Sequence, residues 1–294
     1  MMAEVGDLET GFVGRAAELA AGQAELARTS SGVSVLAVTG EPGIGKSRYL
    51  SEIRRYAERA GWLVAAGQAS EQERELPFSA FADALTPLVL GHPALVAGLP
   101  VGLVDAVGAV LPAVGEPPSA PGTVLRHHAH LATQALLERL TADRALLLLL
   151  DDVHWADDGT VELIDHLLRH DLSGRLLLAV GFRPQQVAGR LAGVLSRAVA
   201  EVGVQYIRLG PLSVEQSAEL LGCAPADPVA HRLHKAADGN PLYLKTMART
   251  GAAGWSSDMT LPADVSAALR AEVERLPAAA HAVIEAAAVL GTVF

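Results

Sequence analysis

The sequence predicts an α/β fold, in which parallel strands form a sheet with helices on both faces. Apolar runs alternate with amphipathic helical patterns along the first two thirds of the chain. One apolar run leads into a glycine-rich segment, Gly-Glu-Pro-Gly-Ile-Gly-Lys-Ser at 40–47, and another ends in two aspartates at 151–152. Ligands of such sheets bind where parallel strands end, so both features are expected at the same edge.

Five apolar runs predict the strands, at 33–39, 62–67, 145–150, 175–181 and 204–209. Each run is almost continuously apolar, which is typical of strands that are covered on both faces. Residues 68–123 interrupt the alternation with many prolines, and we expect a helical insertion there that ends in a mobile loop near 115–122. A helix is predicted over 124–140. From Ser213 onward only helical patterns remain, apart from a polar linker at 251–260.

The segment 40–47 matches the phosphate-binding P-loop pattern G-x-x-x-x-G-K-[ST] in full. In such a loop, backbone N–H groups at the start of a helix surround a polyphosphate. Lys46 would reach the β- and γ-phosphates, and the Ser47 hydroxyl would bind Mg²⁺. The chain has only three lysines, and one of them fills the position that the motif requires.

Two carboxylates follow the third predicted strand and complete this site. We expect Asp151 to hold Mg²⁺ through water, and Asp152 to orient or deprotonate the water that attacks the γ-phosphate. Arg183 follows the next strand, so it is predicted to contact the γ-phosphate and to distinguish ATP from ADP. Asp157 or Asp158 is the expected N-cap of the helix that comes after the paired acids.

The composition argues against several other classes of protein. The net charge is −10 and basic residues do not cluster, so direct binding of nucleic acid by these residues is not expected. Cys223 is the only cysteine, so no intrachain disulfide forms. The acidic N-terminus lacks the basic and apolar parts of a signal peptide, and the leucine run at 146–150 is too short to span a bilayer. We therefore expect a cytoplasmic location without membrane contact.

Taken together, these motifs resemble the nucleotide-binding module of signal-transduction ATPases with numerous domains (STAND), a branch of the AAA-like P-loop ATPases. Within that branch the sequence most resembles the N-terminal part of the large ATP-binding LuxR-type transcription regulators of bacteria. The segments that carry the resemblance are 12–15 with Glu18, 40–47, 146–157, 180–184 and 239–244. They extend over nearly the whole chain.

The resemblance implies which positions contact ATP or ADP. Val13, Gly14 and Arg15 would line the adenine side, and Pro241 would pack on the base or sugar and close the site. The residues that would bind the phosphates are Gly40, Gly43, Ile44, Gly45, Lys46, Ser47 and the backbone amide of Arg48. Mg²⁺ would be held by Ser47 and Asp151. The catalytic group would comprise Lys46, Asp151, Asp152 and Arg183.

The resemblance also implies the domain organisation. The fold would be that of a P-loop NTPase with sheet order 5-1-4-3-2, in a nucleotide-binding domain over 1–210 that contains the insertion 68–123. An all-α lid domain would follow over 211–255, and the start of a winged-helix domain over 256–294. The chain ends abruptly, so we expect a fragment of a longer protein, with sensor and helix-turn-helix domains downstream.

The function that this organisation predicts is a nucleotide-driven switch. ADP would keep the lid closed, ATP would favour an open form that self-associates, and slow Mg²⁺-dependent hydrolysis would reset the switch. One alternative is an AAA-class ATPase like the DNA-replication initiators, which would need a lid arginine, for which Arg249 is the only nearby candidate, and a basic winged helix. Another is a small-molecule P-loop kinase, which would need an acceptor pocket and lid arginines.

Overall fold

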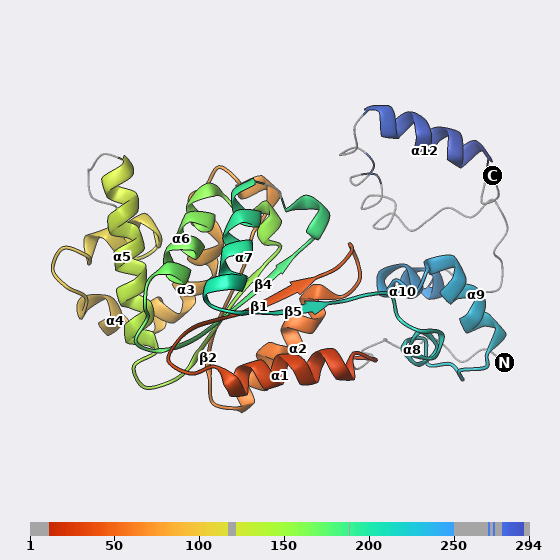
Figure 1. Cartoon of the computed structure of the whole chain (residues 1–294), viewed down its shortest axis with the longest axis horizontal. Coiled ribbons are helices and arrows are strands. Elements are labelled where there is room, and N and C mark those ends of the chain that lie inside the picture. Colours follow the sequence, from red (N-terminus) through yellow and green to blue (C-terminus); the bar gives the residue numbers. More distant parts are fainter. Residues whose placement is uncertain are drawn as a thin grey trace. The chain divides into compact units, whose positions relative to one another are not determined.

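The computed structural model describes residues 12–116, 122–187, 189–249, 270, 273 and 278–290. The chain divides into two compact units. The first unit is Gly14–Gly210, and the second combines the residues up to Val13 with those from Pro211 onward. Figure 1 shows the elements of both units.

The first unit is built on a parallel sheet of five strands in the order β2-β3-β4-β1-β5. The strands are β1 (Gly32–Thr39), β2 (Leu63–Gln68), β3 (Leu146–Asp151), β4 (Arg175–Phe182) and β5 (Val204–Arg208). Read from the other edge, this is the predicted order 5-1-4-3-2, so the predicted P-loop NTPase fold class is confirmed. The predicted strand positions are also confirmed, with ends that differ by at most one residue.

The register of the sheet brings the carboxyl ends of the strands to one edge. Thr39 at the end of β1 lies opposite Phe182 in β4. Gln68 at the end of β2 lies opposite Asp151 at the end of β3. Because residues that follow these strands start from the same edge, the loop after β1 and the acids after β3 are positioned to meet there.

Helices cover both faces of the sheet, as predicted. The helices of this unit are α1 (Ala16–Arg28), α2 (Lys46–Arg59), α3 (Ser79–Gly91), α4 (Ala94–Ala97), α5 (Gly122–Leu140), α6 (Asp158–Arg169) and α7 (Gly189–Glu201). Short 3₁₀ turns are η1 (Glu71–Glu73), η2 (Asp105–Ala109), η3 (Val153–Trp155) and η4 (Pro184–Gln186). Figure 1 shows α1 and α2 on one face of the sheet and α6 and α7 on the other.

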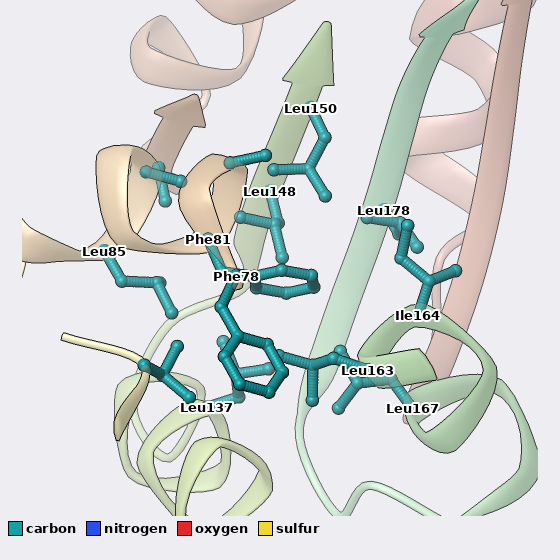
Figure 2. Close-up of a cluster of buried hydrophobic side chains, with 14 of the residues drawn as sticks. Phe78, Phe81, Leu85, Leu137, Leu148, Leu150, Leu163, Ile164, Leu167 and Leu178 are labelled. Carbon is teal, nitrogen blue, oxygen red and sulfur yellow. The ribbon is translucent and has the colours of Figure 1, made fainter. Parts of the chain in front are cut away.

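The main hydrophobic core lies between the sheet and helices α3, α5 and α6. Side chains alternate between the two faces of a strand, and every second residue of β3 faces this core, as Leu146, Leu148 and Leu150 do. Figure 2 shows Leu148 and Leu150 near Phe78 and Phe81, together with leucines of α6. These side chains are buried, so this layer fixes the position of β3 and of the acids at its end.

Between β2 and residue 116 the structure has η1, α3, α4 and η2, and no strand lies among these described residues. The next helix, α5, begins at Gly122 rather than at the predicted residue 124. The centre of the predicted mobile loop, residues 117–121, lies outside the described residues.

Asp157 fixes the start of α6 and the start of α3 together. It is the N-cap of α6, as the sequence predicted, and accepts hydrogen bonds from the Thr160 amide at 2.8 Å and the Thr160 hydroxyl at 2.6 Å. Its Oδ1 atom also accepts from the backbone N–H of Phe78 at 2.9 Å. Phe78 has a left-handed backbone with φ of 63°, which is rare for a bulky residue. The buried carboxylate of Asp157 therefore holds an unusual turn in place.

The described part of the second unit contains helices α8 (Val214–Leu220), α9 (Pro228–Ala237), α10 (Pro241–Arg249) and α12 (Ala278–Leu290). The first three of these helices pack around Leu212, Leu233 and Leu244, and Val13 adds to the same cluster. The predicted linker at 251–260 lies outside the described residues, and so does most of the predicted winged-helix start. In the described part of the chain, no helix has both the length and the apolar character needed to cross a membrane.

Candidate functional site

The glycine-rich loop between β1 and α2 has a backbone that requires glycine at two positions. Gly45 caps α2 with a left-handed backbone, φ 103°, and Lys46 is the first residue of the helix. A Cβ atom on Gly40 would lie 2.7 Å from the carbonyl oxygen of Leu209 and 2.7 Å from Ile44. The loop therefore turns tightly between strand and helix and directs the free N–H groups of the helix start toward the edge of the sheet.

Lys46 lies over this loop and is nearly buried, with 6% of the residue exposed. Its Nζ atom donates to the carbonyl oxygens of Gly40 at 3.0 Å and Glu41 at 3.1 Å. Burial lowers the pKa of Lys46, and the nearby positive charge of Arg183 lowers it further. The charges of Asp151 and Asp152 act in the opposite direction. These groups thus lie within electrostatic reach of one another.

Asp151 connects the end of β3 to the start of α2. Its carboxylate accepts a hydrogen bond from the Ser47 side chain, and its Oδ1 atom accepts from the backbone N–H of Asp152 at 2.8 Å. Burial raises the pKa of Asp151, and the hydrogen bond from Ser47 opposes this rise. The two residues predicted to hold Mg²⁺ are therefore in direct contact.

Asp152 is held by a residue that the sequence analysis did not single out. Its backbone is left-handed, φ 52°, and its Oδ2 atom accepts from the Gln68 side-chain amide at 2.9 Å. The backbone N–H of Gln68 in turn donates to Asp83 of α3 at 3.0 Å. His154 lies on the other side, with Nδ1 at 3.9 Å from Asp152 Oδ1. A glutamine at a strand end belongs to no motif, and only the pairing of β2 with β3 brings it here.

Gly181 of β4 is a second residue that was missed. A Cβ atom at this position would lie 2.2 Å from Asp151 Oδ1 and 3.0 Å from Leu50. The neighbouring strand therefore needs a glycine to make room for the carboxylate. An isolated glycine inside an apolar strand is the signal that could have indicated a close approach.

We expect Gly181→Ala to destabilise the fold by about 1–3 kcal/mol, because the added methyl group forces the partly buried carboxylate of Asp151 aside. Thermal unfolding of the two proteins tests this. Gly193→Ala in α7 is the matched control, since its Cβ would meet only Arg197 at 3.7 Å and alanine favours a helix. A Gly181→Ala protein that melts at or above the temperature of the parent would contradict the close approach.

Arg183 follows β4 and caps the short η4 turn. It lies at the carboxyl edge of the sheet, and its charge lowers the pKa of Lys46. Gln185, two residues on, donates through its side-chain amide to the Glu41 carboxylate of the glycine-rich loop. The segment after β4 is thus tied to that loop, and Arg183 joins the group formed by Lys46, Asp151 and Asp152.

The remaining predicted residues of the first unit occupy different positions. Arg48 is half-exposed on α2 and its guanidinium lies 3.3 Å from Glu52, so only its amide belongs to the helix start. Arg15 is buried in a left-handed conformation, donates to the carbonyl oxygen of Gly210, and lies 3.3 Å from Glu18. Gly14 precedes it with φ of 66°. Arg15 therefore joins the start of α1 to the segment after β5.

Val13 and Pro241 belong to the second unit. Val13 packs against the leucine cluster of that unit. Pro241 begins α10, where the side chain of Asn240 accepts from the Leu242 amide at 3.0 Å. Because the two units are described separately, the predicted contact of Val13 and Pro241 with a nucleotide stays a prediction.

The sheet order, the glycine-rich loop and the paired acids define a P-loop NTPase fold. The family model of the AAA ATPase domain matches residues 11–180, more than half of the chain. The chain therefore belongs to the AAA ATPase domain family.

Solved structures show the same fold at low sequence identity. The ORC1 protein of Aeropyrum pernix, solved in complex with DNA, is 17% identical with a TM-score of 0.50, and the match covers 93% of this chain and 72% of that one. The ORC2 protein of the same organism, solved as ADPNP-ADP complexes, is 16% identical with a TM-score of 0.50, covering 83% and 66%.

A STAND protein with a tetratricopeptide repeat sensor from Pyrococcus horikoshii is 19% identical, with a TM-score of 0.42 and 85% of this chain covered. The present chain spans only 31% of that protein's length. No curated protein matches the sequence. At these identities the structural likeness shows the fold alone.

Proposed function

We propose that this chain is an ATP- and ADP-binding regulatory switch that hydrolyses ATP slowly with Mg²⁺, as a module of a LuxR-type transcription regulator. The observation that carries the nucleotide site is the glycine-rich loop with Lys46 at the start of α2, next to Ser47, whose side chain donates to the Asp151 carboxylate. Membership of the AAA ATPase domain family supports it. The nucleotide complexes of the ORC2 protein, which shares the fold, agree with this assignment. The regulator context depends on the sequence resemblance.

Phosphate binding follows from the loop and from Lys46. The helix start presents N–H groups and the positive end of the helix dipole, which favour an anion. The ammonium of Lys46 donates to two neutral carbonyl oxygens of the loop. The β- and γ-phosphates would offer it charged acceptors instead, and charge-assisted hydrogen bonds are about twice as strong as neutral ones.

The oxygen atoms of Ser47, at the start of α2, and of Asp151, at the end of β3, suit Mg²⁺. This cation prefers oxygen ligands, and usually takes only one or two from the protein in addition to phosphates and waters. The Ser47 hydroxyl and the Asp151 carboxylate are oxygen donors in direct contact. The positive charge of bound Mg²⁺ would stabilise the ionised form of Asp151, against the effect of burial. Bound Mg²⁺ would neutralise charge on the phosphate oxygens.

Asp152 is the group that would orient the attacking water. The Gln68 amide occupies Oδ2 of this carboxylate, and Oδ1 faces His154 at 3.9 Å. A carboxylate in this position can accept a proton from water as the bond to the γ-phosphate forms. We expect hydrolysis to be slow, because no arginine of the chain is assigned as a transition-state finger.

The switch would depend on Arg183. This guanidinium is the predicted contact of the γ-phosphate, which ATP carries and ADP lacks. A ligand shifts an equilibrium between two states only through its difference in affinity for them. ATP would therefore favour the open, self-associating state, and downstream sensor and helix-turn-helix domains would use that change.

We expect Arg183→Ala to reduce the preference for ATP over ADP by about tenfold, a loss of about 1.4 kcal/mol, while ADP affinity changes much less. Competition binding measures both affinities. Light scattering should show that the parent self-associates with an ATP analogue and Mg²⁺ but not with ADP, and that Arg183→Ala has lost this difference. Arg197→Ala, an exposed α7 variant whose parent side chain pairs with Asp165, is the control. Equal discrimination in the Arg183 variant and the parent would refute the sensor role.

The alternative function, an ATPase like the DNA-replication initiators, makes a different prediction. The ORC1 protein that shares this fold was solved with DNA. The present chain has a net charge of −10, and neutralisation of DNA phosphates supplies most non-specific affinity. We expect no sequence-specific shift of duplex DNA at physiological salt. Tight specific binding would favour the initiator-like function.

A further inference from the structure

A cavity of about 530 Å³ lies outside the candidate nucleotide site. Its walls come from the segment before α3, from η2, from α5 and from the start of α6, and no residue of the glycine-rich loop or of the paired acids lines it. Sites for small organic molecules have volumes of about 300–1,000 Å³ and are lined mainly by apolar groups with a few polar ones. This cavity has both the size and the composition of such a site.

The lining identifies the kind of molecule that fits. Apolar surface comes from Phe78, Leu125 and Ala129 among others. Charged lining residues of both signs are Arg74, Glu75, Arg126, Asp157 and Asp158. The Asp157 carboxylate is already hydrogen-bonded to Phe78 and Thr160. Three acids beside two arginines make the cavity unsuited to a polyphosphate, and the apolar surface favours a mostly apolar molecule without net charge.

The backbone of one wall is strained. Phe78 lies in the left-handed region with φ of 63°, and it is held there by the hydrogen bond from its N–H to Asp157. Such conformations persist only where surrounding structure enforces them, and they concentrate at ligand and switch sites. Gly159 permits this arrangement, because a Cβ there would lie 3.2 Å from the Phe78 ring.

The same wall is connected to Asp152 by a short, fixed segment. The η3 turn, Val153–Trp155, joins Asp152 to the residues that precede Asp157. Within it the Trp155 ring lies under the guanidinium of Arg74, 5.3 Å from ring centroid to Cζ. Arg74 and Asp157 both line the cavity, so a molecule that displaces either of them acts on the segment that carries Asp152.

We propose that this cavity binds a drug-sized, mostly apolar organic molecule without net charge, and that its occupancy alters ATP hydrolysis through the segment from Asp152 to Asp157. The binding site stands on the cavity itself. The effect on hydrolysis rests on the proposed function.

The neutral fluorescent probe N-phenyl-1-naphthylamine tests the site directly. We expect saturable binding of one probe per chain, with energy transfer from Trp155 because that ring contacts a lining residue. Trp155→Phe should keep the directly excited probe emission and lower the transfer, with the remainder coming from Trp62 and Trp255. Probe emission without saturation, or transfer that Trp155→Phe leaves unchanged, would place the probe elsewhere and overturn the site.

Two partly exposed lining positions allow the cavity to be altered without emptying the core. Ala109→Phe should fill it, and Leu125→Glu should place a charge on its apolar wall. Each substitution should lower the affinity for the probe by about tenfold or more, since small changes in an apolar pocket have effects of that size. The matched control is Val101→Glu, which changes an apolar side chain of the same insertion that is 95% exposed. Circular dichroism verifies that each variant folds.

Parent-like probe binding in both Ala109→Phe and Leu125→Glu would overturn the proposed site. Hydrolysis of ATP is then measured with and without saturating probe. We expect the probe to change the turnover of the parent and to have little effect on Leu125→Glu at the same concentration. Unchanged turnover of the parent would overturn the link to Asp152. Probe binding in a protein that binds no ADP would refute the proposed function and leave the cavity site standing.

Discussion

The Lys46→Ala variant is expected to lose at least about 100-fold in affinity for both ADP and ATP. Lys46 is buried over the glycine-rich loop, so its ammonium needs no large rearrangement to meet a phosphate. A hydrogen bond to a charged group contributes about 1.5–3 kcal/mol, and 2.7 kcal/mol corresponds to 100-fold in affinity. Calorimetric titration measures the loss.

The fold should survive this change, because the hydrogen bonds that Lys46 Nζ donates go to the loop itself. Circular dichroism and thermal unfolding verify that point. Lys235→Ala is the matched control, since Lys235 is exposed on α9 in the second unit and lies outside the proposed site. Parent-like ADP affinity in a well-folded Lys46→Ala protein would remove the basis for the proposed phosphate site.

The Asp152→Asn variant should bind ATP and hydrolyse it at least about 100-fold more slowly than the parent. A positioned general base contributes about 10²–10⁴-fold to a reaction rate, and asparagine cannot take up the proton. The amide of asparagine can still accept from Gln68, so the local structure should remain. Asp151→Asn should behave differently and raise the Mg²⁺ concentration needed for activity, because Asp151 contacts Ser47.

Phosphate release under single-turnover conditions separates these effects. Asp143→Asn, an exposed position between α5 and β3, is the control and should match the parent. If Asp152→Asn releases phosphate at the parent rate, Asp152 serves only to cap the η3 turn.

The sheet could be predicted from the sequence because its strands are buried on both faces. β3 reads as six residues of which five are leucine, and β4 is apolar along almost its whole length. Such runs are typical of parallel strands that are buried on both faces, and the short length of each run favours a strand over a helix. The turn after β1 could also be predicted, from the glycine-rich motif. Gly45 in that motif adopts a φ that other residues rarely reach.

The supporting residues of the site were not predictable in the same way. Gln68 meets Asp152 only because β2 pairs with β3 in one particular register. Gly181 is required by a carboxylate on the neighbouring strand. Arg15 was predicted for the adenine side of the site, but its contact with a carbonyl oxygen 195 residues away along the chain was not. Contacts of this kind depend on how distant segments pack, and no local pattern records them.

The most direct test of the central claim is equilibrium binding of a fluorescent ADP analogue, labelled on the ribose, to the complete chain with Mg²⁺. The proposed site predicts saturation at one nucleotide per chain, and displacement of the label by both unlabelled ADP and ATP. It also predicts that inorganic phosphate at the same concentration displaces little, because the loop and Lys46 surround a polyphosphate. The absence of saturable binding would contradict a nucleotide site at the carboxyl edge of the sheet.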